Sequence, residues 1–311
     1  MKKILLAVIT LIMTAGAVSA QQYMYVWMKD GTHQSYLISE LDSVGFYLPE
    51  NIGGNTGGIG VFSVSATEKV QFAPGNLQYQ ASTDTWRFAE HQYDYIGDAN
   101  KNISSTYSGW IDLFGWGTGN APTKSSTSDS DYGTFIDWGQ NTISNGGNDA
   151  GLWRTLSREE WEYLFHGRTN YDKLFGLGNV AGVNGVIILP DNWDETKPQG
   201  LSFQPSVANG LTWKSTYYLC RRCDRYTDNT YSAKQWDDLM QSAGAVFLSA
   251  SGDRYGNEVL YTDSYCRYWS STQDGSNNAN YLNISTEYLY VQINNGRAHG
   301  QSVRLVRVLM N

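Results

Sequence analysis

Apolar and polar residues alternate most regularly near the C-terminus of this 311-residue chain. Two apolar sets there lie in opposite registers: Leu282 and Ile284, followed by Leu289, Val291 and Ile293. Alternation at every second position is typical of a strand, and a change of register is what a turn between two strands requires. The pattern therefore predicts two strands joined by a turn at 285–288, a further turn at 294–296, and a closing strand at 303–306.

The positions between these apolar residues hold Tyr, Asn, Gln, Arg and His, and we expect them to face outward. This outward set is Tyr281, Asn283, Tyr288, Tyr290, Gln292 and Asn294, with Arg297, His299 and Gln301 beyond. Tyrosine supplies a large amphipathic contact area with few torsions to freeze, and Asn supplies adaptable hydrogen bonds. An ordinary solvated sheet is the alternative, but clustered exposed tyrosines favour a contact surface.

The N-terminal part predicts a small β unit at 21–48. Met24 and Val26 alternate with aromatic residues, residues 29–31 form a turn signal, and 36–38 are expected to return as the partner strand. So short a segment cannot bury its own core, so it docks on the main domain or pairs with another chain. Residues 49–60 are a Gly-rich linker.

The main domain is expected at 61–311, with short strands at 61–64, 69–72, 186–189 and 245–248. Two capping boxes mark helix starts, one from Ser157 to Glu160 and one from Ser232 to Gln235, and Gly244 ends the second helix. Two helices among many short strands and long loops predict an α+β fold with antiparallel strands.

Composition and charge indicate the type of fold and argue against some classes of function. With 32 Gly, 22 Tyr and 11 Trp the chain is a loop-rich, aromatic fold, and 41% hydrophobic residues suffice for one sizeable core. Residues 1–20 resemble a signal peptide, which predicts an exported protein that is periplasmic, cell-surface or extracellular. No later stretch is apolar enough to span a membrane. The net charge of −8 argues against a nucleic-acid surface.

Candidate chemistry is sparse, and we expect no catalytic residue, metal site or cofactor. Cys220 and Cys223 have the spacing of redox and zinc sites, but a disulfide from one of them to Cys266, or free thiols, remain open. Asp129 and Asp131 alternate before Gly133 as in a calcium loop, yet the remaining ligands of such a loop are missing. The chain lacks H-E-x-x-H, G-x-S-x-G and phosphate-loop motifs.

Four segments resemble a known group of proteins. The run Trp-Arg-Thr-Leu-Ser-Arg-Glu-Glu-Trp-Glu-Tyr-Leu at 153–164 is similar to the helix motif of the C-type lectin fold of the formylglycine-generating-enzyme type. Residues 244–248, 268–271 and 302–307 resemble exported paralogous lectin-fold proteins, a group that includes variable proteins of diversity-generating retroelements. The resemblance covers nearly all of 60–311 and implies a C-type lectin-like fold.

In the retroelement proteins the fold holds the backbone fixed while surface residues of the last segment are diversified. The resemblance implies these framework residues: Tyr268, Trp269, Leu282, Val303, Leu305 and Val306. It implies these diversified, ligand-contacting residues: Thr272, Gln273, Asn278, Asn280, Tyr281, Asn283, Tyr288, Tyr290, Gln292, Asn294, Asn295, Arg297, His299 and Gln301. A fixed paralogue that was never diversified has much the same sequence.

The sequence thus favours a secreted ligand-binding protein, not an enzyme, whose partner is an unidentified protein or glycan. A structural or adhesion component assembled through 21–48 is the alternative. A formylglycine-type oxidase is a third hypothesis, and it lacks a partner for Cys266 in the expected reactive pair.

Overall fold

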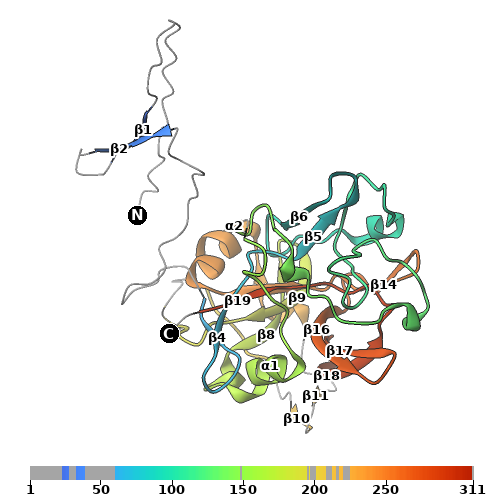
Figure 1. Ribbon diagram of the computed structural model, residues 1–311. Helices are drawn as coiled ribbons and strands as arrows, with labels where there is room; N and C mark the ends of the chain where they lie inside the picture. Colours follow the sequence, from blue (N-terminus) through green and yellow to red (C-terminus); the bar gives the residue numbers. More distant parts are fainter. Residues whose placement is uncertain are drawn as a thin grey trace, which may run out of the picture. The chain divides into compact units, whose positions relative to one another are not determined.

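The computed structural model describes residues 23–27, 33–38, 60–147, 149–194, 196, 201–207, 212–214, 217–219 and 225–309. The chain forms two compact units, Met1–Gly54 and Asn55–Asn311. In the first unit, β1 (Tyr23–Trp27) pairs with β2 (His33–Leu37) in an antiparallel hairpin, as predicted (Figure 1). The expected signal peptide, the 29–31 turn, Cys220, Cys223 and nearly all of the linker lie outside the described residues.

The second unit is mixed α+β, with few helices and mostly small antiparallel sheets, so the predicted fold class is confirmed at this level. Helix α1 (Arg158–Glu162) continues into a π-helical turn, Tyr163–Gly167. Its capping box forms as expected, because the Ser157 hydroxyl accepts a hydrogen bond from the Glu160 backbone N–H at 3.2 Å.

Helix α2 (Ala233–Gln235) is likewise capped by Ser232 and continues through a π-helical turn, Trp236–Met240, and a 3₁₀ turn, Gln241–Ala243. Gly244 ends this helix at a φ of 95°, a left-handed conformation that glycine adopts without strain. Other 3₁₀ turns lie at Ala81–Thr83, Gly97–Asn102, Asp129–Asp131, Trp138–Gln140, Tyr171–Lys173 and Tyr226–Asp228.

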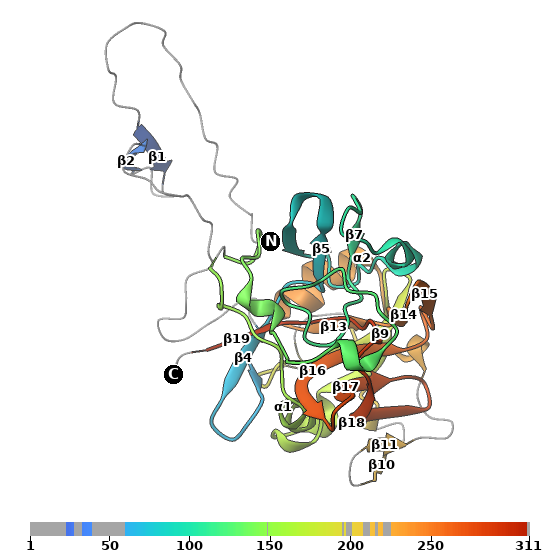
Figure 2. The same cartoon turned by 45° about the vertical axis from the view of Figure 1, so that its right-hand side comes forward.

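The C-terminal segment supplies three strands of a five-stranded antiparallel sheet (Figure 2). In spatial order its strands are β10 (Thr212–Trp213), β11 (Tyr217–Leu219), β18 (Tyr288–Gly296), β17 (Asn278–Ile284) and β16 (Cys266–Asp274). The turn predicted at 285–288 separates β17 from β18. The turn predicted at 294–296 is wrong, because those residues still pair with β17 and the chain turns at 297–298.

A four-stranded sheet shares the main hydrophobic core with α1. Its strands in order are β12 (Thr230–Tyr231), β8 (Phe175–Val180), β9 (Val183–Ile188) and β13 (Val246–Ser249). Three smaller sheets complete the unit. One pairs β14 (Asp253–Tyr255) with β15 (Glu258–Leu260), and a second contains β19 (Val306–Val308), β4 (Lys69–Phe72) and β3 (Phe62–Ser63) in that order. The third contains β6 (Thr85–Phe88), β5 (Leu77–Gln80) and β7 (Trp110–Ile111). The strands predicted around 61–72, 186–189 and 245–248 therefore form, although the closing strand begins only at Val306.

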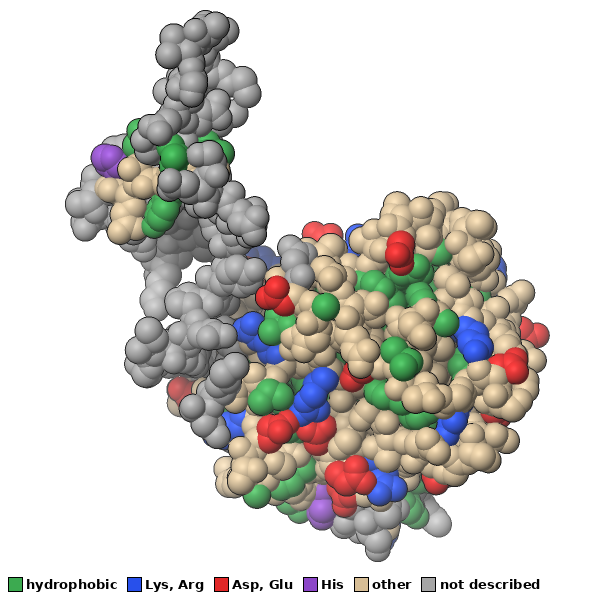
Figure 3. All heavy atoms as spheres, viewed as in Figure 1, with side chains coloured by type: hydrophobic (Ala, Val, Ile, Leu, Met, Phe, Trp, Pro, Cys, Tyr) green, Lys and Arg blue, Asp and Glu red, His purple; other side chains and the backbone are tan. Residues whose placement is uncertain are grey.

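Charged side chains of both signs are mixed on the visible face of the second unit (Figure 3). Hydrophobic side chains reach that face only as small patches between polar ones.

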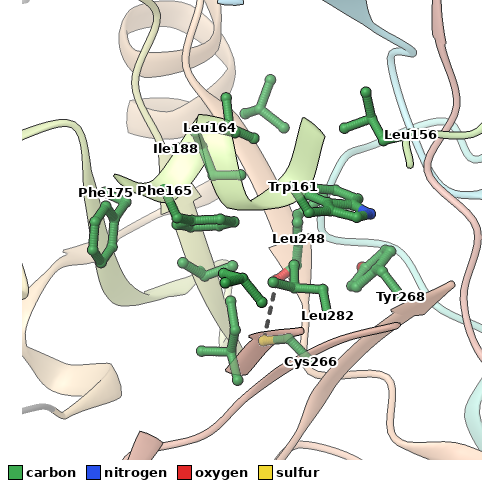
Figure 4. Packing of buried hydrophobic residues seen from close by; sticks show 14 of the residues in the cluster. Leu156, Trp161, Leu164, Phe165, Phe175, Ile188, Leu248, Cys266, Tyr268 and Leu282 are labelled. Carbon is green, nitrogen blue, oxygen red and sulfur yellow. Dashed lines mark hydrogen bonds between the residues drawn. The ribbon is translucent and has the colours of Figure 1, made fainter. Parts of the chain in front are cut away.

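The main core lies between α1 and the two larger sheets. Trp161, Leu164 and Phe165 of the helix point toward Leu248 and Leu282, as Figure 4 shows. Fully buried apolar side chains of this kind each contribute about 1.5–3 kcal/mol. This core covers one face of the five-stranded sheet.

Buried arginines stabilise the long loops in place of regular structure. The Arg304 guanidinium donates to the carbonyl oxygens of Phe247 at 2.8 Å and Ala73 at 3.2 Å, and to Asn76 Oδ1 at 3.1 Å. Arg297 donates to the carbonyls of residues 132, 133, 275 and 278 in the same way. A guanidinium offers five donors in a fixed plane, so one side chain can satisfy carbonyls from several loops.

Candidate functional site

Strand register places four side chains in one row across the five-stranded sheet. Arg267 of β16 is paired with Asn283 of β17, Asn283 with Tyr290 of β18, and Tyr290 with Tyr217 of β11. Directly opposite residues point to the same side of a sheet. Their sequence neighbours Cys266, Ile284 and Leu289 belong to the core against α1, so the row lies on the opposite face.

Five tyrosines follow one another on this face, and we call them the tyrosine row. They are Tyr261, Tyr265, Tyr288, Tyr290 and Tyr217. Successive ring centroids are 5.2, 6.2, 4.6 and 4.7 Å apart, within the range of favourable aromatic pairs. Tyr261 is 52% exposed and the other four are partly exposed, so the row forms a continuous aromatic strip that solvent reaches.

The turn that presents Tyr261 and Tyr265 is held rigidly. Tyr261 has a φ of 61°, a left-handed conformation that costs a bulky residue about 1–2 kcal/mol. Asn184 secures the turn, since its side-chain amide donates to the Asp263 carbonyl at 3.0 Å. The Tyr226 hydroxyl donates to the Ser264 carbonyl at 2.7 Å. Strain maintained by surrounding contacts is typical of functional surfaces.

Arg267 links the tyrosine row to a set of polar side chains. Its guanidinium carbon lies 4.9 Å from the ring centroids of both Tyr261 and Tyr265. Its Nη1 atom is 2.8 Å from Asp253 Oδ2, and the same oxygen is 3.0 Å from His299 Nδ1. We call Asp253, Arg267, Asn283 and His299 the polar cluster.

Three atoms of the polar cluster have no hydrogen-bond partner among the described residues. They are Asp253 Oδ1, Arg267 Nε and Asn283 Oδ1. Asp253 and Asn283 are only 2% and 3% exposed. An unpaired buried donor or acceptor costs about 1–3 kcal/mol. The cluster therefore carries two unmet acceptors and one unmet donor beside the aromatic strip.

Burial changes the pKa of one tyrosine of the row, Tyr288, and of the neighbouring Tyr281. Burial, together with a hydrogen bond to Tyr265, raises the pKa of Tyr288 above its ordinary value. Burial likewise raises the pKa of Tyr281, which lies next to the cluster, and the Arg267 charge opposes that rise. Neutral tyrosine hydroxyls can donate and accept hydrogen bonds at physiological pH.

Five of the fourteen residues that the resemblance implied as ligand-contacting surface residues are buried, so a surface position is wrong for them. They are Asn280, Tyr281, Asn283, Arg297 and Gln301, each at most 5% exposed. Tyr281 packs against Trp269, with ring centroids 6.0 Å apart, in a second hydrophobic core. β17 is flanked by strands on both edges and covered on both faces. Its alternating apolar and polar side chains therefore point into buried surroundings, on one face or the other.

A β-bulge divides the remaining residues between faces. The pairing of β17 with β18 shifts by one residue between Tyr281 and Asn283. Gln292 accordingly donates to the Glu162 carboxylate of α1, away from Tyr290. Thr272 is also on that side, where its hydroxyl accepts from the Arg158 N–H at 3.0 Å.

The other predicted residues lie in two different regions of the surface. Gln273, Asn278, Asn294 and Asn295 gather where β16, β17 and the end of β18 meet, and each is at least partly exposed. His299 lies at the polar cluster, and the Tyr255 ring is tilted against its ring, with the two centroids 4.8 Å apart. Of the predicted set, the structure thus brings together Tyr288, Tyr290, Asn283 and His299.

Sequence reasoning missed Tyr217, Tyr261, Tyr265, Asp253 and Arg267. A weak signal was present, because 253–268 is rich in tyrosine. Tyr217 lies 73 positions before Tyr290 in the chain, and only strand pairing joins them.

Comparisons with known proteins assign neither a family nor a function to the chain. No protein-family model matches the chain, and searches of curated proteins and of solved structures found no match. Within the described residues, no helix has the length and apolar character needed to cross a membrane. The described residues also contain no group of three or more His, Cys, Asp or Glu side chains that could hold a metal ion.

The cysteine and aspartate residues that the sequence offered as possible chemical sites have structural surroundings. Cys266 is a free thiol among the described residues and is 0% exposed, and burial raises its thiol pKa. Cys220 and Cys223, the partners considered for it, lie outside the described residues. Asp129 Oδ1 accepts from the Ala298 N–H at 2.8 Å, and the Asp131 carboxylate accepts from the Ser126 hydroxyl. These carboxylates hold loops beside the C-terminal segment.

Proposed function

We propose that this protein is an exported recognition protein that binds its ligand on the tyrosine row. The observation that carries the proposal is the continuous strip of five tyrosines, assembled from three separate segments of the chain. Tyrosine combines a flat apolar ring with a hydroxyl, so such a strip can contact a ligand over a large area and still hydrogen-bond to it.

The proposed architecture is a C-type lectin-like fold. Two features agree with the resemblance: a capped helix at 158–162 packs on the C-terminal strands, and the implied framework residues Tyr268, Trp269 and Leu282 are fully buried. A fixed core beneath variable surface positions is what a diversified protein needs. Diversification itself would be established by a near-copy of the final segment beside a reverse transcriptase gene, differing at adenines.

The burial pattern limits which residues diversification could change freely. Replacing Asn280, Tyr281 or Arg297 would disturb packing or hydrogen bonds, whereas Tyr288 and Tyr290 could change with little effect on the fold. If the segment is diversified, we expect the changes to concentrate at exposed positions.

An adhesion role is the second candidate, and the N-terminal hairpin favours it. Tyr25 and Tyr36 of β1 and β2 are 51% and 41% exposed. Two-stranded hairpins are marginally stable alone, so this one is suited to gain strands from a partner. The oxidase hypothesis needs a reactive thiolate, and the buried Cys266 is poorly suited to that role.

A binding screen tests the proposal. The full-length mature protein is applied to immobilised neutral oligosaccharides, sulfated oligosaccharides and extracellular-protein fragments. We expect the Tyr288→Ala/Tyr290→Ala double variant to lose a ligand that the wild type and the control variant Tyr36→Ala both retain. The proposal fails if the double variant keeps every ligand, or if the wild type binds none.

Deleting 21–48 distinguishes the two candidates. A monomeric deletion variant that still binds through the row supports recognition. Loss of an oligomer together with loss of surface attachment supports adhesion.

A further inference from the structure

The tyrosine row and the polar cluster together restrict the chemistry of the ligand. The row offers apolar ring faces, while the cluster offers one unmet donor, Arg267 Nε, and two unmet acceptors, Asp253 Oδ1 and Asn283 Oδ1. A ligand that completes this site must present an apolar face and groups that both donate and accept hydrogen bonds.

We infer that the site takes a neutral glycan, with sugar rings lying on the tyrosines and sugar hydroxyls supplying the missing hydrogen bonds of the polar cluster. This inference rests on the proposed function of the row. A hydroxyl group is one donor and two acceptors at once, so adjacent hydroxyls can serve a guanidinium N–H and a carboxylate oxygen together. The C–H face of a sugar ring supplies the apolar surface.

The charges of the cluster favour a neutral ligand over an anionic one. Arg267 is already paired with Asp253 at 2.8 Å, so its charge is largely compensated. The unmet Asp253 oxygen would repel a sulfate or carboxylate placed beside it. The whole chain carries a net charge of −8, which further disfavours a polyanion.

Part of the site is ordered before any ligand arrives. Tyr261 is fixed at positive φ, and the Arg267 guanidinium lies 4.9 Å from the ring centroids of both Tyr261 and Tyr265, which are in contact with each other. Rigid aromatic anchors reduce the entropy lost on binding. The three unmet atoms are inaccessible to solvent, so we expect small movements of the partly exposed Tyr265 and Tyr288 side chains to admit the hydroxyls.

Isothermal titration of the full-length mature protein with a panel of neutral gluco-, xylo- and manno-oligosaccharides tests this inference. EDTA is present throughout, so that any binding observed is independent of metal ions. We expect Tyr265→Ala to weaken binding at least tenfold and Tyr265→Phe, which keeps the ring, to weaken it less than threefold.

A second pair of variants tests the polar cluster. Arg267→Lys preserves the charge opposite Asp253 but removes the Nε donor, and we expect at least a fivefold loss of affinity. Arg158→Lys changes an arginine on α1, outside the site, and should leave affinity unchanged. Thermal melting of each variant verifies that it is folded.

The outcomes separate this inference from the proposed function. If a protein fragment binds through the tyrosine row but no neutral oligosaccharide does, the glycan inference is wrong and the recognition function stands. If sulfated oligosaccharides bind more tightly than neutral ones, the inference is also overturned. If no ligand of any class depends on the row, both proposals fail.

Discussion

Tyr281 and Tyr290 lie on the same face of neighbouring strands, yet we predict very different consequences for their replacement by alanine. Tyr281 is 5% exposed and packs on Trp269, whereas Tyr290 is partly exposed and its ring pairs with those of Tyr217 and Tyr288 in the row. A buried aromatic side chain removes about 150–250 Å² from water, worth about 4–6 kcal/mol at 25 cal/mol per Å². Buried aromatic-to-alanine replacements cost about 3–5 kcal/mol, so we expect about 4 kcal/mol for Tyr281→Ala.

For Tyr290→Ala the loss is limited to two ring contacts, with Tyr217 at 4.7 Å and Tyr288 at 4.6 Å. Cross-strand pairs of this kind contribute about 0.2–1 kcal/mol each, which gives a total of about 1 kcal/mol. The expected ratio between the two substitutions is therefore about four to one.

Urea denaturation, followed by fluorescence of the buried tryptophans and by far-ultraviolet circular dichroism, measures both values. With a slope of about 2.5 kcal/mol per M, the midpoint should fall by about 1.6 M for Tyr281→Ala and about 0.4 M for Tyr290→Ala. Equal slopes for the variants and the wild type serve as the control for two-state behaviour. Equal midpoint shifts for the two variants, or a larger shift for Tyr290→Ala, would refute the assignment of Tyr281 to the buried core and of Tyr290 to the exposed row.

Three further predictions concern buried groups. Burial raises the pKa of Asp112 from 3.8 to about 6. The protonated carboxyl therefore contributes about 3 kcal/mol to the free energy of unfolding, which is present below pH 4 and is lost as pH rises through 6. Asp112→Asn should remove this component from the pH dependence measured by urea denaturation. Arg304→Met should cost about 3–5 kcal/mol in the same assay, because the carbonyls of Phe247 and Ala73 lose their donors; a cost below 1 kcal/mol would show that the loops do not depend on Arg304. In a variant whose other two cysteines are serine, Cys266 should react with a thiol reagent only as fast as the protein unfolds, because the thiol is fully buried; rapid labelling of the native state would contradict this.

The elements that the sequence located correctly are those set by local interactions. Both capping boxes are made within four residues, by Ser157 with Glu160 and by Ser232 with Gln235, so the helix starts can be recognised without knowing what the helices pack against. The turn at 285–288 could also be predicted, because the apolar positions change register between residues that are close together in the sequence.

Several residues expected on the outward surface are buried, for a physical reason. Alternation shows which residues share a face of a strand but not what covers that face. Tyr281 and Asn283 alternate with Leu282 just as an exposed set would, yet loops and neighbouring strands bury both sides of β17. The bulge that sends Gln292 toward α1 leaves no periodic signal, since it depends on pairing with another strand.

The sequence by itself determined the α+β class, the helix starts, the strands of the C-terminal segment, and the presence of Tyr288 and Tyr290 on it. Only the tertiary structure decided that Tyr217, Tyr261 and Tyr265 join them, and that Arg267 and Asp253 lie alongside. Those partners come from distant parts of the chain, and their contacts are created by strand pairing and loop closure. Local patterns carry no information about such contacts, because many tertiary arrangements satisfy the same alternation.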